Sequence, residues 1–274
     1  MESAERRTRG NPLNALLMLA TAAIVFFAIY ARQSANDFLY RPPPKSSYEP
    51  DEEFQFFSAK DGKKIHFFWA NDKQSARTAL YFCGSGEDLA AAMPLLSSYQ
   101  LRGFNVASIE YRGFGYSEGK PSQAALFEDG LAIYDFIAGE IGGDESSMIL
   151  HGHSLGGAVA MEIAARRKPG ALILESSFNS AYSVLLGMDW IPGDLYRNKA
   201  KAENVACPVL LIHGENDSIV PLANVVDLAS GFPEQDRVSR YFVSGGGHSD
   251  LPAVAGIGYW SSIESFIRKL DSNR

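Results

Sequence analysis

One serine stands in a setting that suits a nucleophile. Ser154 is the centre of the pentapeptide Gly152-His153-Ser154-Leu155-Gly156, which lies between an apolar run and a helical pattern. Glycines two positions before and after a serine let a strand and a helix pack closely across a sharp turn that exposes the hydroxyl. A serine hydroxyl is a weak nucleophile by itself, so it needs a general base, and the base needs an acid that orients it. The pentapeptide therefore indicates acyl transfer if an acid and a histidine accompany it.

An acid and a histidine do follow, in a suitable order. Asp217 comes just after the apolar run 209–213. His248 comes directly after the glycine-rich segment 244–247, which follows the next apolar run. Folds built around this kind of serine turn carry their acid and histidine in that chain order, each in a loop after a strand. We therefore expect Ser154 to be the nucleophile, His248 the general base and Asp217 the residue that orients the base.

Other residues near these positions offer alternatives. Glu215 and Glu175 also follow apolar runs and are alternative acids, although Asp217 is favoured. His151 and His153 would suggest a metal ion only if a third, suitably spaced ligand accompanied them, and the sequence offers none. We expect His153 to shape the serine turn, and we expect neither a metal nor a cofactor.

Two backbone amides are expected to stabilise the oxyanion that forms during acyl transfer. Preorganised N–H groups aimed at the developing charge need no rearrangement during the reaction. One such group belongs to Leu155, which follows the nucleophile at a helix N-terminus. The loop 83–88 follows an earlier apolar run, and we assign the second N–H group to Ser85 in that loop.

The same loop also imitates a dinucleotide-binding motif. Gly84-Ser85-Gly86 follows a predicted strand and precedes a predicted helix. The third glycine of that motif is replaced by Leu89, and the acidic pair at 87–88 would repel a pyrophosphate. A nicotinamide-dependent oxidoreductase is therefore disfavoured.

The chain around these residues has an ordinary globular composition with an apolar N-terminal end. Of 274 residues, 46% are hydrophobic and 21% are charged, and the net charge is −7. Such a chain is too apolar to be a disordered tail, and its acidity disfavours nucleic acid as a partner. Its two cysteines are too few for a disulfide framework or a four-thiolate zinc site.

The uncharged stretch 13–31 predicts a membrane anchor. Its 19 residues would span about 28 Å as a helix, close to the hydrocarbon thickness of a bilayer. A cleaved signal peptide is the alternative, but its apolar region is usually shorter and a small-residue cleavage site is missing. Basic residues flank both ends equally, so orientation rests on the short tail 1–12, which favours a cytoplasmic N-terminus and a catalytic domain on the other side.

The remaining chain predicts a stiff spacer and one large domain. Residues 32–47 include three consecutive prolines, which favour an extended spacer. From residue 48 to 274, strand and helix patterns alternate, as in one α/β domain with a mostly parallel sheet. The eight predicted strands are 54–58, 64–69, 79–83, 104–109, 148–152, 171–174, 209–213 and 240–243. The predicted helices are 88–101, 121–138, 155–167, 220–230 and 254–270.

The sequence from about residue 52 to 270 resembles the alpha/beta-hydrolase superfamily. More narrowly, the motif 110–119, Glu-Tyr-Arg-Gly-Phe-Gly-Tyr-Ser-Glu-Gly, with Pro121-Ser122 after it, is similar to the membrane-anchored bud-emergence-like branch. This resemblance implies an eight-stranded sheet with an antiparallel start, helices on both faces, and the triad Ser154, Asp217 and His248. That family usually has His-Gly-Asn where this chain has Cys83-Gly84-Ser85.

These features together predict a membrane-anchored serine hydrolase that cleaves a carboxylester, thioester or lipid ester. A peptidase or amidase of the same fold, and a tethered scaffold without activity, are the alternatives. Residues 176–206, called the cap below, are too few for a large lid domain. They predict either one packed helix with a loop or a small apolar rim that admits acyl chains.

Overall fold

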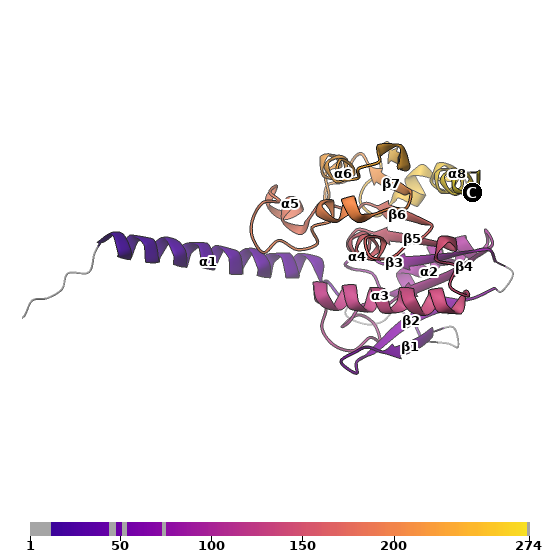
Figure 1. The fold of residues 1–274 in the computed structure, drawn as a ribbon, viewed down its shortest axis with the longest axis horizontal. Helices are drawn as coiled ribbons and strands as arrows, with labels where there is room; N and C mark the ends of the chain where they lie inside the picture. Colours follow the sequence, from indigo (N-terminus) through magenta and orange to yellow (C-terminus); the bar gives the residue numbers. More distant parts are fainter. Residues whose placement is uncertain (1–11, 44–47, 51–53, 73–74, 273–274) are drawn as a thin grey trace, which may run out of the picture.

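An eight-stranded sheet forms the centre of the molecule (Figure 1). The computed structural model describes residues 12–43, 48–50, 54–72 and 75–272. The strands lie in the order β1-β2-β4-β3-β5-β6-β7-β8. Their bounds are β1 Phe54–Ser58, β2 Lys64–Ala70, β3 Arg77–Phe82, β4 Phe104–Ile109, β5 Met148–His153, β6 Ala171–Glu175, β7 Val209–Gly214 and β8 Val238–Val243. All eight predicted strands are confirmed.

Strand direction divides the sheet into two parts. The pairs β1/β2 and β2/β4 are antiparallel, whereas every pair from β4/β3 to β7/β8 is parallel. This confirms the predicted antiparallel start. Parallel strands end at one edge of a sheet, so the loops after β3, β5, β6, β7 and β8 gather there, where open α/β sheets bind their ligands.

Helices cover both faces of the sheet. Neighbouring residues of β3 show the alternation, since Phe82 lies against Gly130 of one helix while Tyr81 lines a cavity beside Trp260 of another. The helices are α2 Leu89–Gln100, α3 Gln123–Glu140, α4 Leu155–Ala164, α5 Ala181–Leu186, α6 Leu222–Ala229, α7 Leu251–Ala255 and α8 Ile257–Ser272. Short 3₁₀ turns occur at Glu145–Ser147, Lys199–Asn204 and Gln235–Arg237.

Capping residues and one glycine explain where the observed helices differ from the predicted ones. The predicted helix 254–270 is two helices, because Gly256 has a φ of +53° between α7 and α8 and breaks the helical path. Helix α3 begins two residues later than predicted because the Ser122 side chain accepts a hydrogen bond from the N–H of Ala125. Pro221 likewise precedes the first residue of α6.

The N-terminal helix is longer than the predicted membrane span. Helix α1 runs from Pro12 to Leu39 and projects from the domain as a rod (Figure 1). The predicted spacer 32–47 is therefore wrong in its first half, since 32–39 are helical. Ala31, Ala35 and Leu39, spaced one turn apart, are buried against the domain, which stabilises these extra turns. Residues 1–11 of the predicted tail and 44–47 of the predicted spacer lie outside the described residues.

The chain that leaves α1 contacts the edge of the sheet where the parallel strands end. The backbone N–H of Arg41 donates to the carbonyl of Ser85 at 3.1 Å, in the loop after β3. The hydroxyls of Tyr40 and Tyr196 are hydrogen-bonded at 2.8 Å, which joins the same segment to the cap. The end of the helical rod is thus attached directly beside the candidate site.

A buried ion pair holds the motif 110–119 against α3, and breaking it should destabilise the domain. Arg112 donates to both carboxylate oxygens of Asp129, at 2.6 and 2.8 Å, and to Asp61 at 2.7 Å. Replacing Arg112 with alanine leaves the buried Asp129 without its partner, so we expect a loss of about 3–5 kcal/mol in the free energy of unfolding. Chemical denaturation measures this loss. Arg268→Ala, which removes an exposed pair with Glu264, is the control, and equal stability of the two variants would contradict the role of Arg112.

Candidate active site

Ser154 occupies a strained turn between β5 and α4. Its backbone has φ +51° and ψ −114°, a conformation that side-chain-bearing residues rarely adopt. The turn closes tightly, because a Cβ atom on Gly152 would lie 2.3 Å from the carbonyl oxygen of Gly156. The N–H of Ser154 donates to the carbonyl of Glu175 at 2.8 Å, which ties the turn to β6. The serine is thereby held out at the edge of the sheet, as the pentapeptide predicts.

The three residues that the sequence singled out are in hydrogen-bond contact. His248 Nε2 lies 3.0 Å from Ser154 Oγ, and His248 Nδ1 lies 2.7 Å from Asp217 Oδ2. The three side chains come from the loops after β5, β7 and β8. A nucleophile, a base and an orienting acid within hydrogen-bond distance are the arrangement that covalent acyl transfer needs.

Asp217 is held as an ionised carboxylate. Burial alone would raise the pKa of Asp217, but the hydrogen bonds from His248 and from the N–H groups of Val220 and Ile219 outweigh it and lower that pKa. The two N–H donors lie 2.8 and 2.9 Å from Oδ1, so Oδ2 stays directed at the histidine. An ionised acid at this position fixes the imidazole with its proton on Nδ1 and Nε2 free to accept.

The alternative acids are engaged elsewhere or exposed. Glu175 Oε2 accepts from Tyr259 at 2.6 Å and lies 3.1 Å from Nε2 of His151. Burial opposes ionisation of Glu175, yet the contacts with His151 and Tyr259 lower its pKa. Glu215 is an exposed residue of the loop after β7. Of the candidate acids, only Asp217 is paired with His248 among the described residues.

The two assigned backbone donors lie on facing loops at this edge. A Cβ on Gly156 would lie 2.0 Å from the carbonyl oxygen of Phe82, so the start of α4 packs directly on the end of β3. The N–H of Gly84 is bonded to the Glu87 carboxylate at 2.6 Å. No acceptor for the N–H of Ser85 or of Leu155 is found in the described part of the chain, and N–H groups without an internal acceptor are what an oxyanion site requires.

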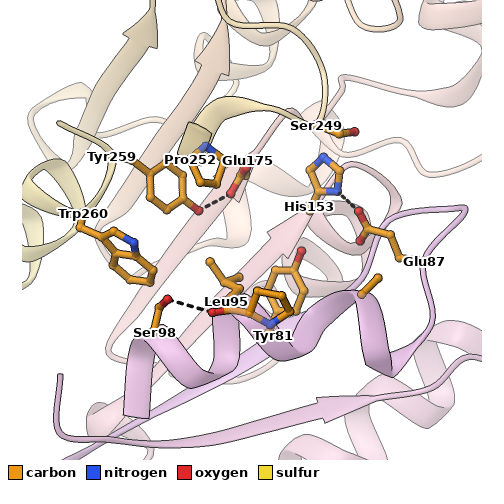
Figure 2. Close-up of a pocket in the computed structure, with 12 residues that line it drawn as sticks. Tyr81, Glu87, Leu95, Ser98, His153, Glu175, Ser249, Pro252, Tyr259 and Trp260 are labelled. Atoms are coloured by element: carbon orange, nitrogen blue, oxygen red, sulfur yellow. Dashed lines mark hydrogen bonds and ion pairs between the residues drawn. The ribbon is translucent and has the colours of Figure 1, made fainter. Parts of the chain in front are cut away.

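A buried histidine and a half-buried glutamate, a pair that the sequence did not reveal, connect these loops. His153 Nδ1 lies 3.0 Å from Glu87 Oε1 (Figure 2), and His153 Nε2 lies 3.0 Å from the backbone carbonyl of His248. Burial by itself would lower the pKa of His153, but the carboxylate of Glu87 outweighs it and raises the pKa to about 9. A protonated His153 donates from both nitrogens and so bridges the loop after β3 to the loop that carries His248.

Neutralising Glu87 should therefore weaken the protein in a pH-dependent way. The pKa of His153, about 9 when folded against the ordinary 6.5, means that the pair stabilises the fold fully below pH 6.5. That stabilisation, about 1.4 kcal/mol per unit of pKa difference, is lost as the pH rises through 9. In Glu87→Gln we expect this alkaline loss to shrink, as measured by denaturation at several pH values. Glu234→Gln, an exposed control, should keep the wild-type profile, and an unchanged profile in Glu87→Gln would contradict the bridge.

A cavity of about 240 Å³ lies beside this bridge, between α2 and the segment α7–α8 (Figure 2). Glu87 and His153 form one wall, Tyr259 and Trp260 form another, and Ser249 lies next in sequence to His248. Figure 2 shows Glu175 bonded to Tyr259 at the back of this cavity. Within the described residues, no group of three histidine, cysteine or acidic side chains is placed to hold a metal ion.

The cap forms a small rim rather than a lid domain. It consists of α5, a loop and the 3₁₀ turn Lys199–Asn204 between β6 and β7. Helix α5 lies beside α1 (Figure 1), and Trp190 in the following loop is 74% exposed. The packed helix α5 with its loop agrees with the first predicted alternative, whereas an apolar rim that admits acyl chains stays a prediction.

Comparison with known proteins agrees with this architecture. A family model described as serine aminopeptidase, S33, matches residues 74–191. The uncharacterised protein YfhR of Escherichia coli is 30% identical over 78% of this chain and 81% of its own length. An uncharacterised protein of Mycobacterium tuberculosis, Rv2307c, is 28% identical over 96% of each chain.

A lipase and an esterase are also similar to parts of the chain. The lysophosphatidylserine lipase ABHD12 of Danio rerio is 34% identical over 43% of this chain and 37% of its own length. The esterase Pf2001 of Pyrococcus furiosus superposes with a TM-score of 0.69 at 17% identity, covering 84% of this chain and 98% of its own. On its sheet, its serine turn and these relatives, the chain belongs to the alpha/beta-hydrolase superfamily.

Proposed function

We propose that the protein is a membrane-anchored serine hydrolase that cleaves carboxylic ester bonds through Ser154, His248 and Asp217. The observation that carries the proposal is the continuous hydrogen-bond chain from Ser154 Oγ through the His248 ring to the buried Asp217 carboxylate. The strained backbone at Ser154 costs stability. A serine with a purely structural role would not need such a turn.

The geometry supports a two-step reaction. Ser154 Oγ attacks the acyl carbonyl while His248 Nε2 takes its proton, and the resulting oxyanion lies between the N–H groups of Ser85 and Leu155. His248 then gives the proton to the leaving oxygen, so that the alcohol departs and an acyl-enzyme remains. Water attacks this acyl group with His248 again as base, which releases the acid and restores the serine. Asp217 stays ionised throughout and stabilises the imidazolium.

The exposed apolar surface of α1 supports an acyl substrate that comes from a membrane. Helix α1 is long and apolar enough to cross a bilayer. Its large side chains are exposed, Met18 at 74% and Phe26 at 73% for example, and this surface is unfavourable in water. The names of two relatives, an esterase and a lysophosphatidylserine lipase, point to the same substrate class. We further propose that the catalytic domain faces away from the cytoplasm, which protease access in intact cells tests.

A chain-length series of esters tests the substrate class. Purified full-length protein in detergent is assayed against nitrophenyl esters of short to long acyl chains and against a lysophospholipid, with Ser154→Ala as the blank. We expect hydrolysis that increases with acyl length. Strict preference for short esters would contradict a membrane-derived substrate, and preference for aminoacyl amides would contradict the ester assignment.

A further inference from the structure

An apolar groove joins the membrane-span part of α1 to the cap. It has a volume of about 430 Å³. Its walls include Val25, Ala28 and Ile29 from α1, and Tyr182, Pro192 and Gly193 from the cap. Near its rim, the Arg32 guanidinium donates to the carbonyl of Gly193 at 3.2 Å. The cap therefore lies alongside residues that belong to the predicted span, rather than beyond its end.

The length of the span fixes how deep the cap must lie. The apolar segment 13–31 is about 28 Å long as a helix, so its whole length is needed to cross a hydrocarbon core of roughly 30 Å. Val25 is six residues before Ala31, or about 9 Å along the helix. If 13–31 crosses the bilayer, the cap residues that share a groove with Val25 and Ile29 lie within the lipid, nearer to the centre of the bilayer than Arg32.

The exposed side chains of the cap suit that position. Trp190 is 74% exposed, and Pro192, two residues further on, is also exposed. Tryptophan rings concentrate where a bilayer meets water, because the ring is largely apolar and its N–H still needs a partner. The one acidic side chain of this loop, Asp189, is not free, since it accepts a hydrogen bond from the amide nitrogen of Asn179, near the start of the cap, at 3.4 Å.

We propose that the cap loop 187–193 is a second membrane contact, inserted into the lipid interface beside α1 with Trp190 as its anchor. This inference rests on the membrane span proposed for α1. It has a consequence for the site, because Arg41 N–H binds the carbonyl of Ser85 at 3.1 Å and so fixes the candidate oxyanion loop next to the end of the span. The catalytic edge of the sheet then lies next to the bilayer.

Quenching of tryptophan fluorescence by brominated lipids tests this contact without any catalytic readout. The full-length protein is reconstituted into phosphatidylcholine vesicles, with and without lipids brominated near the top of the acyl chains. The chain has three tryptophans, of which Trp190 is the exposed one in the cap. We expect wild-type fluorescence to be quenched by the brominated lipid, and Trp190→Phe to lose most of that quenching.

Trp260→Phe is the matched control, because the half-buried Trp260 packs on Tyr99 and Tyr259 of the domain, away from the cap, and its replacement should leave the quenching unchanged. Equal quenching in wild type and Trp190→Phe would overturn the proposal. Resistance of the protein to alkaline extraction from the vesicles is measured in parallel. Protein that resists extraction but shows no quenching of Trp190 overturns the cap contact alone, whereas extractable protein overturns the span and the contact together. Ester hydrolysis in detergent reports separately on the catalytic proposal.

Discussion

Replacing Ser154 with alanine should lower the turnover number for ester hydrolysis by at least about three orders of magnitude while the protein stays folded. The hydroxyl is the attacking group in the proposed mechanism, and His248 and the backbone donors offer no substitute for it. Alanine leaves the strained turn in place, since Gly152 and Gly156 provide its tight packing. A continuous assay with a long-chain nitrophenyl ester measures the loss, and circular dichroism confirms folding.

Ser230→Ala is the control for this experiment. Ser230 lies at the end of α6 and is exposed, where its hydroxyl donates to the carbonyl of Asp227. This variant should hydrolyse the ester at the wild-type rate. A Ser154→Ala protein with more than about a tenth of wild-type turnover would contradict the nucleophile assignment.

Replacing Asp217 with asparagine should lower turnover by about three to four orders of magnitude near neutral pH. The two N–H donors at Oδ1 would still hold the side chain, but the amide group at the position of Oδ2 can donate to His248 Nδ1. That interaction favours the imidazole tautomer with its proton on Nε2, which cannot accept the proton of Ser154. The loss should appear in kcat, with little change in KM.

The same variant should change the acid stability of the protein. The pKa of Asp217 is lowered in the folded state from its ordinary value of 3.8, so its stabilisation is present above that value and is lost as the pH falls through the folded pKa. Asp217→Asn should therefore lose part of this acid-dependent step. Glu215→Gln, two residues earlier in the same loop and exposed, is the matched control. Loss of activity in Glu215→Gln with retention in Asp217→Asn would reverse the assignment of the acid.

The sheet and the grouping of the candidate residues could be predicted because local patterns determine them. Most of the parallel strands centre on an apolar run, as β6 and β7 do, and glycine spacing marks the turn at Ser154. Once the sheet is parallel, the loops that carry Asp217 and His248 must emerge at the edge that holds Ser154. The sequence order of three loops was therefore enough to predict their contact.

The bridge from Glu87 to His153 could not be predicted, because it depends on how two distant loops pack. His153 stands between the glycine and the nucleophile, where many residue types shape a turn, and Glu87 lies in a loop that could be interpreted only as a source of backbone donors. Nothing in their spacing indicates that a carboxylate meets a buried imidazole. The signal that exists is chemical, since an acid in a loop next to a candidate oxyanion site needs a cation nearby.

The end of α1 and its packing on the domain could also not be predicted from local sequence patterns. A span ends in sequence where charges begin, but the helix continues past Arg32 because Ala35 and Leu39 are buried on the domain. Helix ends are decided by such tertiary contacts as much as by propensity. This continuation brings the end of α1 to the catalytic edge and places the cap beside the proposed span, which is the basis of the proposed second membrane contact.

Mapping the adduct of a fluorophosphonate probe tests the central claim most directly. Such probes phosphonylate a serine whose hydroxyl is activated by a neighbouring base. The folded full-length protein is labelled and digested, and the modified peptide is sequenced by mass spectrometry. The mechanism predicts one adduct, on Ser154, that is absent from heat-denatured protein and from Ser154→Ala. An adduct on another serine, or labelling of Ser154→Ala at the wild-type level, would contradict it.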